Sequence, residues 1–129
     1  MPRGPYICGL DAAMDIVGGK WKALILWELK DQPRRFGQLR QSLTGISEKM
    51  LIQRLRELEA DEIVYRKVYA HVPPKVEYGL TEAGTALHRA LLPLAQWGER
   101  RMEALDEQTA GHLTVVDDPS PSPWAARSA

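Results

Sequence analysis

Residues 36–60 of the chain are FGQLRQSLTGISEKMLIQRLRELEA, two helical patterns with a short break between them. Phe36, Leu39 and Leu43 give the first pattern an apolar stripe, because spacings of three and four residues return to the same face of a helix. Gly45 lies in the break and suits the positive φ of a helix end. Two helices about a short glycine-containing turn predict a helix-turn-helix.

The second helix of this pair is expected to run from Ser47 to about Ala60. Ser47 can cap it by accepting a hydrogen bond from a free backbone amide of the first turn. Leu51, Leu55 and Leu58 are spaced four and three residues apart, so they form a buried stripe. At about 100° per residue, the opposite face carries three polar side chains: Lys49, Gln53 and Arg56.

Two further helices are expected before the pair. Apolar residues at spacings of three, four and seven predict a first helix from Leu10 to Val17, which Gly18-Gly19 ends. A second helix, from Trp21 to Leu29, is apolar on nearly every side apart from Lys22 and Glu28. Such a helix is typically buried, and we expect it at the centre of the core.

After the pair, the period of the pattern changes to two. Residues 63–69 and 76–80 are rich in β-branched and aromatic side chains and predict two strands. Residues 70–75 join them and contain paired prolines, which cannot enter a ladder, so this loop should project as a wing. Thr81 then caps a long last helix. The predicted fold class is mainly α with a small β-wing, a winged helix-turn-helix.

The last helix has a wider apolar arc than one domain's core needs, and so has the first. We therefore expect the protein to dimerise through these terminal helices, with an interface that includes Leu10, Met14, Leu91, Leu94 and Trp97. Periodicity is lost from about Asp106. The expected organisation is an N-terminal arm (1–7), one winged-helix domain with its dimerisation helix (8–105) and a disordered tail (106–129).

Charge is distributed unevenly along the 129 residues, although the net charge is zero. The segment 20–80 holds 12 Lys/Arg and 8 Asp/Glu, and the remainder holds 5 and 9. A basic middle between acidic ends is a modest footprint for a nucleic-acid partner. With one cysteine, no signal-like start and no apolar run long enough to span a bilayer, we expect a cytoplasmic protein with no membrane partner.

Catalytic motifs are not found. His71, His88 and His112 have no neighbouring ligand at metal-binding spacing, and there is no glycine-rich phosphate loop or recognised nucleophile motif. We therefore expect no enzyme activity, no catalytic residues, no metal and no cofactor.

Several motifs, in order, resemble the HxlR family of bacterial regulators. They are CGL and DIVGGKW within 8–21, RFGQL at 35–39, QRLREL at 53–58 and PPKVEYGLT at 73–81, and the resemblance extends from Cys8 to Trp97. It implies a transcriptional regulator, more often a repressor, that binds a palindromic operator in double-stranded DNA as a homodimer. It also implies that a thiol near the first helix can control DNA binding, although the family's cysteine is often followed by proline and Gly9 follows here.

The polar face of the helix over 47–60 is the one that a major groove would meet. Lysine and arginine donate to guanine, and glutamine pairs with adenine. N-terminal residues of such a helix usually reach the bases, so Ser47 and Lys49 are the best placed, ahead of Gln53 and Arg56. Arg54 projects beside the buried stripe, and we expect it to pair with an acidic neighbour instead. Contacts to the phosphate backbone or the minor groove are expected from Arg34, Arg35, Lys67, His71 and Lys75.

Cys8 has two interpretations. It is either a small, partly buried apolar residue or a sensor of oxidants or electrophiles, since thiols at helix N-termini are often reactive. Two functional alternatives also remain open. One is a winged-helix module that binds proteins and has lost DNA binding, and the other is the same DNA-binding protein controlled by a small-molecule ligand rather than by a thiol.

Overall fold

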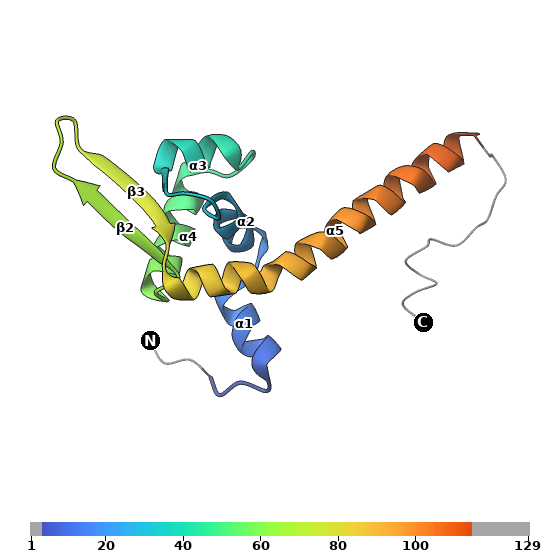
Figure 1. The fold of residues 1–129 in the computed structure, drawn as a ribbon, viewed down its shortest axis with the longest axis horizontal. Coiled ribbons are helices and arrows are strands. Elements are labelled where there is room, and N and C mark those ends of the chain that lie inside the picture. The colour runs from blue at the N-terminus through green and yellow to red at the C-terminus, as the bar shows by residue number, and fades with distance from the viewer. Residues whose placement is uncertain (1–3, 115–129) are drawn as a thin grey trace. The chain divides into compact units, whose positions relative to one another are not determined.

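In the computed structural model, the backbone is described for residues 4–114 and the side chains for residues 4–108. The helices are α1 (Gly9–Val17), α2 (Lys20–Glu28), α3 (Phe36–Ser42), α4 (Glu48–Ala60) and α5 (Glu82–Thr114). The strands are β1 (Arg34–Arg35), β2 (Val64–Tyr69) and β3 (Lys75–Leu80). Figure 1 shows α3 and α4 beside the β2–β3 ribbon, which confirms the mainly helical winged fold.

The turn between α3 and α4 follows the predicted chemistry. Gly45 has a φ of 94°, a conformation that glycine adopts without the steric cost that other residues bear. The hydroxyl of Ser47 accepts a hydrogen bond of 3.1 Å from the backbone N–H of Met50, so Ser47 caps α4 as expected.

The core lies around α2 and the buried stripe of α4, as the patterns predict. The largest fully buried side chains come from α2, α3 and α4; they are Ile25, Leu26, Leu39, Leu51, Leu55 and Leu58. One residue of α2 departs from this apolar set, because Lys22 is only 6% exposed. Its partner on α4 is described below.

The sheet has a third strand that the sequence did not predict. Its antiparallel order is β1-β3-β2, with Arg35 opposite Glu77 and Arg34 opposite Tyr78. A strand of two adjacent arginines has no apolar alternation, which explains why the sequence pattern predicts no strand at these residues. Its pairing fixes two candidate DNA-binding residues, Arg34 and Arg35, beside the middle of β3.

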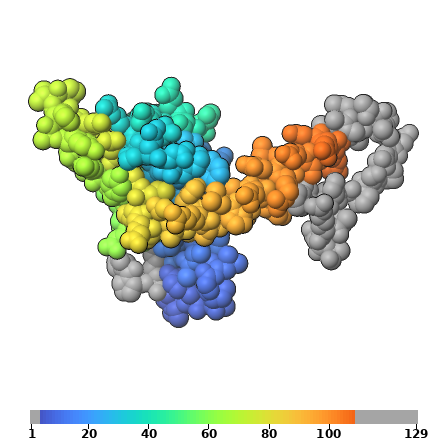
Figure 2. All heavy atoms as spheres, in the orientation of Figure 1, coloured from blue at the N-terminus to red at the C-terminus, as the bar shows by residue number. Residues whose placement is uncertain are grey.

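The wing itself is the β2–β3 hairpin with its loop. Tyr69 pairs with Lys75 at the loop end of the ladder, and Val72 in the loop is fully exposed. Figure 2 shows this end of the hairpin, in yellow-green, projecting beyond the helices that lie next to it. Gly79 on β3 leaves room for the ring of Tyr65 on β2, because an added Cβ would lie 2.3 Å from that ring.

The chain divides into two compact units between Arg89 and Ala90, within α5. In the first unit, the side chain of Thr81 caps α5 as expected, accepting a hydrogen bond of 3.0 Å from the N–H of Gly84. In the second unit, α5 continues to Thr114, past residue 106 where we expected a disordered tail to begin. The remainder of that expected tail lies outside the described residues. No helix between residues 4 and 114 is long and apolar enough to span a membrane.

Candidate nucleic-acid interface

The exposed face of α4 brings together the polar side chains that its helical spacing predicted. Lys49, Gln53 and Arg56 are all exposed. Together with Ile52 and two carboxylates they line one open hollow, which we call the helix-face hollow: Glu48, Lys49, Ile52, Gln53, Arg56 and Glu57. Among the described side chains, Lys49, Gln53 and Arg56 form no hydrogen bond or ion pair, so their donors are available to a ligand.

Both carboxylates at the edge of this hollow have cationic partners. Glu48 forms an exposed ion pair of 3.6 Å with Arg40 of α3. Glu57 bonds to Lys22 of α2, at 2.9 Å, and to Arg54 of its own helix. Arg54 therefore has the acidic partner that we expected for it. Neither carboxylate is left to repel an anion at the helix face.

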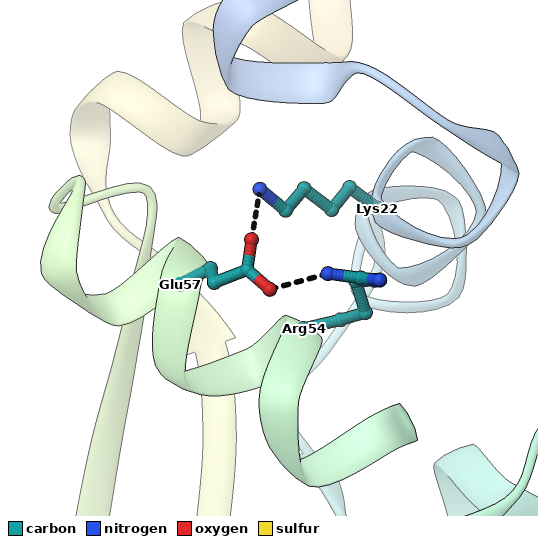
Figure 3. Close-up of polar contacts among 3 residues, drawn as sticks. All are labelled: Lys22, Arg54 and Glu57. Atoms are coloured by element: carbon teal, nitrogen blue, oxygen red, sulfur yellow. Dashed lines mark hydrogen bonds and ion pairs between the residues drawn. The ribbon is translucent and has the colours of Figure 1, made fainter. Parts of the chain in front are cut away.

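The hydrogen bond from Lys22 is the main reason why the pKa of Glu57 lies below its ordinary value of 4.5, and burial partly opposes it. Figure 3 shows the three side chains, with Lys22 reaching one oxygen of Glu57 and Arg54 the other. The carboxylate of Glu57 therefore stays ionised at neutral pH.

A second hollow lies between α4 and the sheet, and it contains an arginine that the sequence analysis missed. Its lining residues are Ile52, Arg56, Glu59, Arg66 and Tyr78. Arg66 is exposed and faces Tyr78 across the ladder. The signal was available, because alternation along β2 puts Arg66 on the same face as the buried Val64. Arg56 borders both hollows and connects the helix face with the wing.

On the other face of the sheet, the expected phosphate-binding lysines contact an aromatic ring. The ammonium groups of Lys67 and Lys75 lie 4.8 Å and 5.0 Å from the centroid of Tyr69. Lys75 also forms an ion pair of 3.5 Å with Glu77. The hydroxyl of Tyr69 is the main cause that lowers the pKa of Glu77, followed by the charges of Lys75 and Arg35. Glu77 is thus a carboxylate among several basic groups.

The tip of the wing joins residues far apart in sequence. Arg35 of β1 lines a hollow there together with the wing loop, whose contributing residues are His71, Val72, Pro73, Pro74 and Lys75. The ring of His71 stacks on Tyr69 at 5.9 Å. Arg34 is half-buried, and its Nε has no hydrogen-bond partner among the described residues. Of the predicted phosphate contacts, Arg35, His71 and Lys75 therefore cluster, whereas Arg34 lines none of these hollows.

Cys8 is exposed, which contradicts its interpretation as a partly buried residue. It occupies the N-cap position of α1, and its side chain makes no capping hydrogen bond. Close by, the backbone N–H of Ile7 donates to the carboxylate of Asp11 at 3.0 Å. The start of α1 is thus held in place while the thiol itself is open to reagents.

The residues expected at a dimer interface are mostly exposed in the single chain. Leu10 and Met14 of α1 are 70% and 50% exposed, and Leu94 and Trp97 of α5 are 63% and 48% exposed. Leu91 is half-buried. Both units therefore carry apolar side chains that the fold does not cover.

Chemically, these surfaces offer donors and cations. Guanidinium, ammonium and amide groups on one helix face can donate to acceptors on base edges, and the wing can place cations near phosphates. Among the described residues, no cluster of His, Cys, Asp and Glu is arranged to hold a metal ion.

Comparison with known proteins agrees with this geometry. Residues 16–106 match the HxlR-like helix-turn-helix family. The uncharacterised HTH-type transcriptional regulator YkvN of Bacillus subtilis is 48% identical over 111 residues, which cover 86% of this chain and 92% of that protein.

Two solved structures are also similar. The redox regulator HypR in its oxidised form has a TM-score of 0.69 at 45% identity, covering 72% of this chain and 96% of that one. Diamide-treated YodB from B. subtilis has a TM-score of 0.63 at 40% identity, covering 73% and 94%. The chain therefore belongs to the HxlR-like helix-turn-helix family of transcriptional regulators.

Proposed function

We propose that this protein regulates transcription in the cytoplasm, binding a palindromic operator as a homodimer with α4 in the major groove. It acts by binding rather than by catalysis, and repression is the simplest outcome of occupying an operator. The observation that carries the proposal is the helix face on which Lys49, Gln53 and Arg56 are exposed together, with every neighbouring carboxylate of the hollow already paired.

The side chains of this face read bases through their hydrogen-bond donors and acceptors. Lys49 and Arg56 donate to guanine N7 and O6, and Gln53 pairs with adenine. Ser47 uses one lone pair as the cap of α4, and its O–H remains free to donate to a base or a phosphate near the start of the helix. Base readout therefore extends along α4 from Ser47 to Arg56.

The wing and the sheet contact the DNA backbone. Arg35, Lys67, His71 and Lys75 bring cations and donors to one side of the hairpin, and Arg66 with Arg56 brings two guanidiniums to the other. Such contacts contribute affinity and position the protein, but they carry little sequence information. Arg34 is half-buried and is a weaker candidate.

Dimerisation uses the apolar side chains that α1 and α5 leave uncovered, among them Leu10, Met14, Leu94 and Trp97. Burying several large side chains contributes roughly 1.5–3 kcal/mol each. The two copies of α4 can then enter successive major grooves about 34 Å apart.

Removing residues 115–129 should leave the dimer intact, whereas ending the chain before Ala90 should abolish it, as light scattering would show.

The test of DNA binding is a titration against salt. Fluorescence anisotropy compares a duplex selected by the wild-type protein from a random-sequence library with a scrambled duplex of equal length and composition. Affinity for the selected duplex should be higher, and its logarithm should fall steeply with the logarithm of salt concentration because counterions are released. Equal, weak and salt-independent binding to both duplexes would support the alternative of a protein-interaction module.

We further propose that Cys8 switches the regulator. Its thiol is exposed at the start of α1, and two similar solved structures are those of an oxidised redox regulator and a diamide-treated regulator. Diamide would take two hydrogen atoms from two Cys8 thiols, forming a disulfide between subunits and becoming a hydrazine. A quinone would instead add to one thiolate as a thioether. Either product would disturb α1 and, through the dimer, the spacing of the two α4 helices.

The switch is tested with diamide and with a Cys8→Ser variant. Oxidant should reduce the operator affinity of the wild type, whereas Cys8→Ser should bind DNA and ignore it. If the wild type keeps its affinity while mass spectrometry shows Cys8 to be modified, the thiol is incidental. Control by a small-molecule ligand would then be the leading alternative.

A further inference from the structure

Lys22 is a charged residue that neither the core nor the proposed base contacts account for. It lies on α2, the central helix, and only 6% of it is exposed. Its ammonium reaches across to α4 and meets the carboxylate of Glu57 at 2.9 Å (Figure 3). Glu57 is about one-third exposed and also lines the helix-face hollow. One residue therefore connects the interior to the edge of the surface proposed to read bases.

The remaining described contacts that hold α4 against its neighbouring helices are apolar, apart from the exposed ion pair of 3.6 Å between Glu48 and Arg40. Leu51, Leu55 and Leu58 are buried, but apolar burial is non-directional and tolerates small rotations of a helix about its axis. Side chains reach about 5–6 Å from the axis, so a rotation of roughly 10° displaces their tips by about 1 Å. Hydrogen bonds to bases are confined to a range of about 0.5 Å in length. Apolar packing alone is thus too permissive for base readout.

An ion pair with hydrogen-bond geometry restricts this rotation. The ammonium of Lys22 is held by a buried stem, and Glu57 lies one turn beyond Gln53 and next to Arg56 on α4. Arg54 binds the second oxygen of the same carboxylate, so the carboxylate cannot follow Lys22 by turning freely. A rotation of α4 therefore changes the distance between Lys22 and Glu57 or breaks the bond between Glu57 and Arg54.

The stability of the fold does not explain the ion pair between Lys22 and Glu57. Removing two charges from water costs about as much as their attraction returns, and apolar replacements of buried ion pairs are often neutral or stabilising. Such a replacement loses the directional hydrogen bond that fixes one helix relative to the other. The lowered pKa of Glu57 agrees with a carboxylate that stays ionised for this contact.

We propose that Lys22 is a positioning residue for DNA recognition: through Glu57 it sets the rotation at which α4 presents Lys49, Gln53 and Arg56 to the major groove. The inference rests on the proposed operator binding. Lys22 and Glu57 touch no base, but their ion pair contributes to discrimination between DNA sequences rather than to folding or to overall affinity.

The test is a double variant, Lys22→Met/Glu57→Leu, which replaces both charges with apolar side chains of similar size. We expect its thermal midpoint to equal or exceed that of the wild type. Its affinity for the scrambled duplex should be unchanged within about twofold. Its preference for the duplex that the wild type selects should fall at least tenfold. The matched control is Lys30→Met/Asp31→Leu, which removes an exposed ion pair of 3.9 Å and should leave the preference intact.

The single variant Glu57→Leu separates the two roles of the pair. It strands the buried ammonium of Lys22, so it should lower the thermal midpoint, and adding Lys22→Met should restore it. A well-folded double variant with wild-type preference would overturn the inference, and so would a double variant that does not fold, since the pair would then hold the fold. A wild type that prefers no duplex would instead refute the proposed function, independently of Lys22.

Discussion

The exposed face of α4 and the wing both carry cations, but among the described side chains two lysines of the wing are engaged within the protein and those of the helix face are not. Lys49 and Arg56 on α4 make no ion pair or hydrogen bond among the described side chains. On the wing, Lys67 and Lys75 lie against the ring of Tyr69, and Lys75 also pairs with Glu77. The first surface can adjust its donors to base edges, whereas the second presents a fixed arrangement of charge, which suits contact with a regular phosphate backbone.

The difference arises from the geometry of helices and ladders. On α4, the carboxylates Glu48 and Glu57 are turned toward neighbouring helices, where Arg40 and Lys22 bind them. In the antiparallel ladder, the register places Glu77 directly between Lys67 on one strand and Arg35 on the other. A carboxylate so placed is within reach of every cation around it.

The largest expected effect is on the helix face. Lys49→Ala and Arg56→Ala should each weaken binding to the selected duplex by about 1–3 kcal/mol if the contact is bidentate. The loss should be much smaller for a scrambled duplex, because these donors read base edges. Anisotropy titrations with folded variants provide the measurement. Arg89→Ala, an exposed arginine of α5, is the control. Unchanged affinity for both helix variants would remove α4 from the groove.

How far the sequence predicts this interface depends on whether a contact is local. The cap by Ser47, the polar face of α4 and the pairing of Arg54 with an acidic neighbour all follow from helical spacing, and the structure confirms their geometry. The burial of Lys22 does not follow, because its partner lies 35 residues away on another helix.

In the wing, too, contacts between residues distant in sequence could not be predicted. The strands β2 and β3 are predictable from alternation, but β1 is not, since two arginines become a strand only by pairing with β3. The position of Arg66 and the enclosure of Arg34 depend on that same pairing. Only the three-dimensional structure therefore shows which of the candidate phosphate-binding side chains are exposed and which are partly buried.

The second prediction concerns the wing. Lys75→Ala should weaken binding to selected and scrambled duplexes alike and reduce the slope of log affinity against log salt by about 0.9. If the wild type and the variant bind equally at 1 M salt, a slope smaller by about 0.9 makes the affinity of the variant roughly fivefold lower than that of the wild type at 0.15 M salt. The same titrations measure it, with Val72→Ala at the fully exposed loop position as the control. A loss confined to the selected duplex would mean that the wing reads bases.

A smaller effect is expected from the carboxylate of the wing. Glu77→Gln removes one negative charge beside the phosphates, so affinity for any duplex should rise by about threefold, the effect of one unit charge some 7 Å away in water. The pKa of Glu77 is lowered, chiefly by the hydroxyl of Tyr69. The negative charge of Glu77, which opposes phosphate binding, is therefore fully present above the ordinary pKa of 4.5 and is lost only as pH falls through the lower folded value.

The ratio of variant to wild-type affinity should therefore be constant between about pH 5.5 and 8, because Glu77 stays ionised over that range in the wild type and the variant carries no charge at this position. Titrations at several pH values, at constant salt, provide the measurement. A ratio that approaches one at pH 6 would show that Glu77 takes up a proton there, and that the wing is not the fixed arrangement of charge described above.

The smallest effect on DNA binding is expected at the turn that joins the two regions. Glu62 lies between α4 and β2 with a φ of 59°, a conformation that a residue with a side chain adopts at a cost. The backbone makes the bonds of a Schellman ending there, from the N–H of Ile63 to Leu58 at 2.9 Å and from that of Glu62 to Glu59 at 2.9 Å. Glycine is the residue preferred at this position.

Glu62→Gly should therefore raise the free energy of unfolding by about 0.5–1 kcal/mol, since relief of the backbone cost exceeds the extra entropy of glycine in the unfolded chain. Affinity for both duplexes should stay within error, because Glu62 lines neither hollow of α4. Urea unfolding measures the first quantity and anisotropy the second. Glu62→Asn, which tolerates this φ, should lie between glycine and the wild type, and Glu62→Val should be destabilised. If Glu62→Gly alters duplex preference without altering stability, this turn sets the angle between α4 and the wing, and the two regions do not act independently.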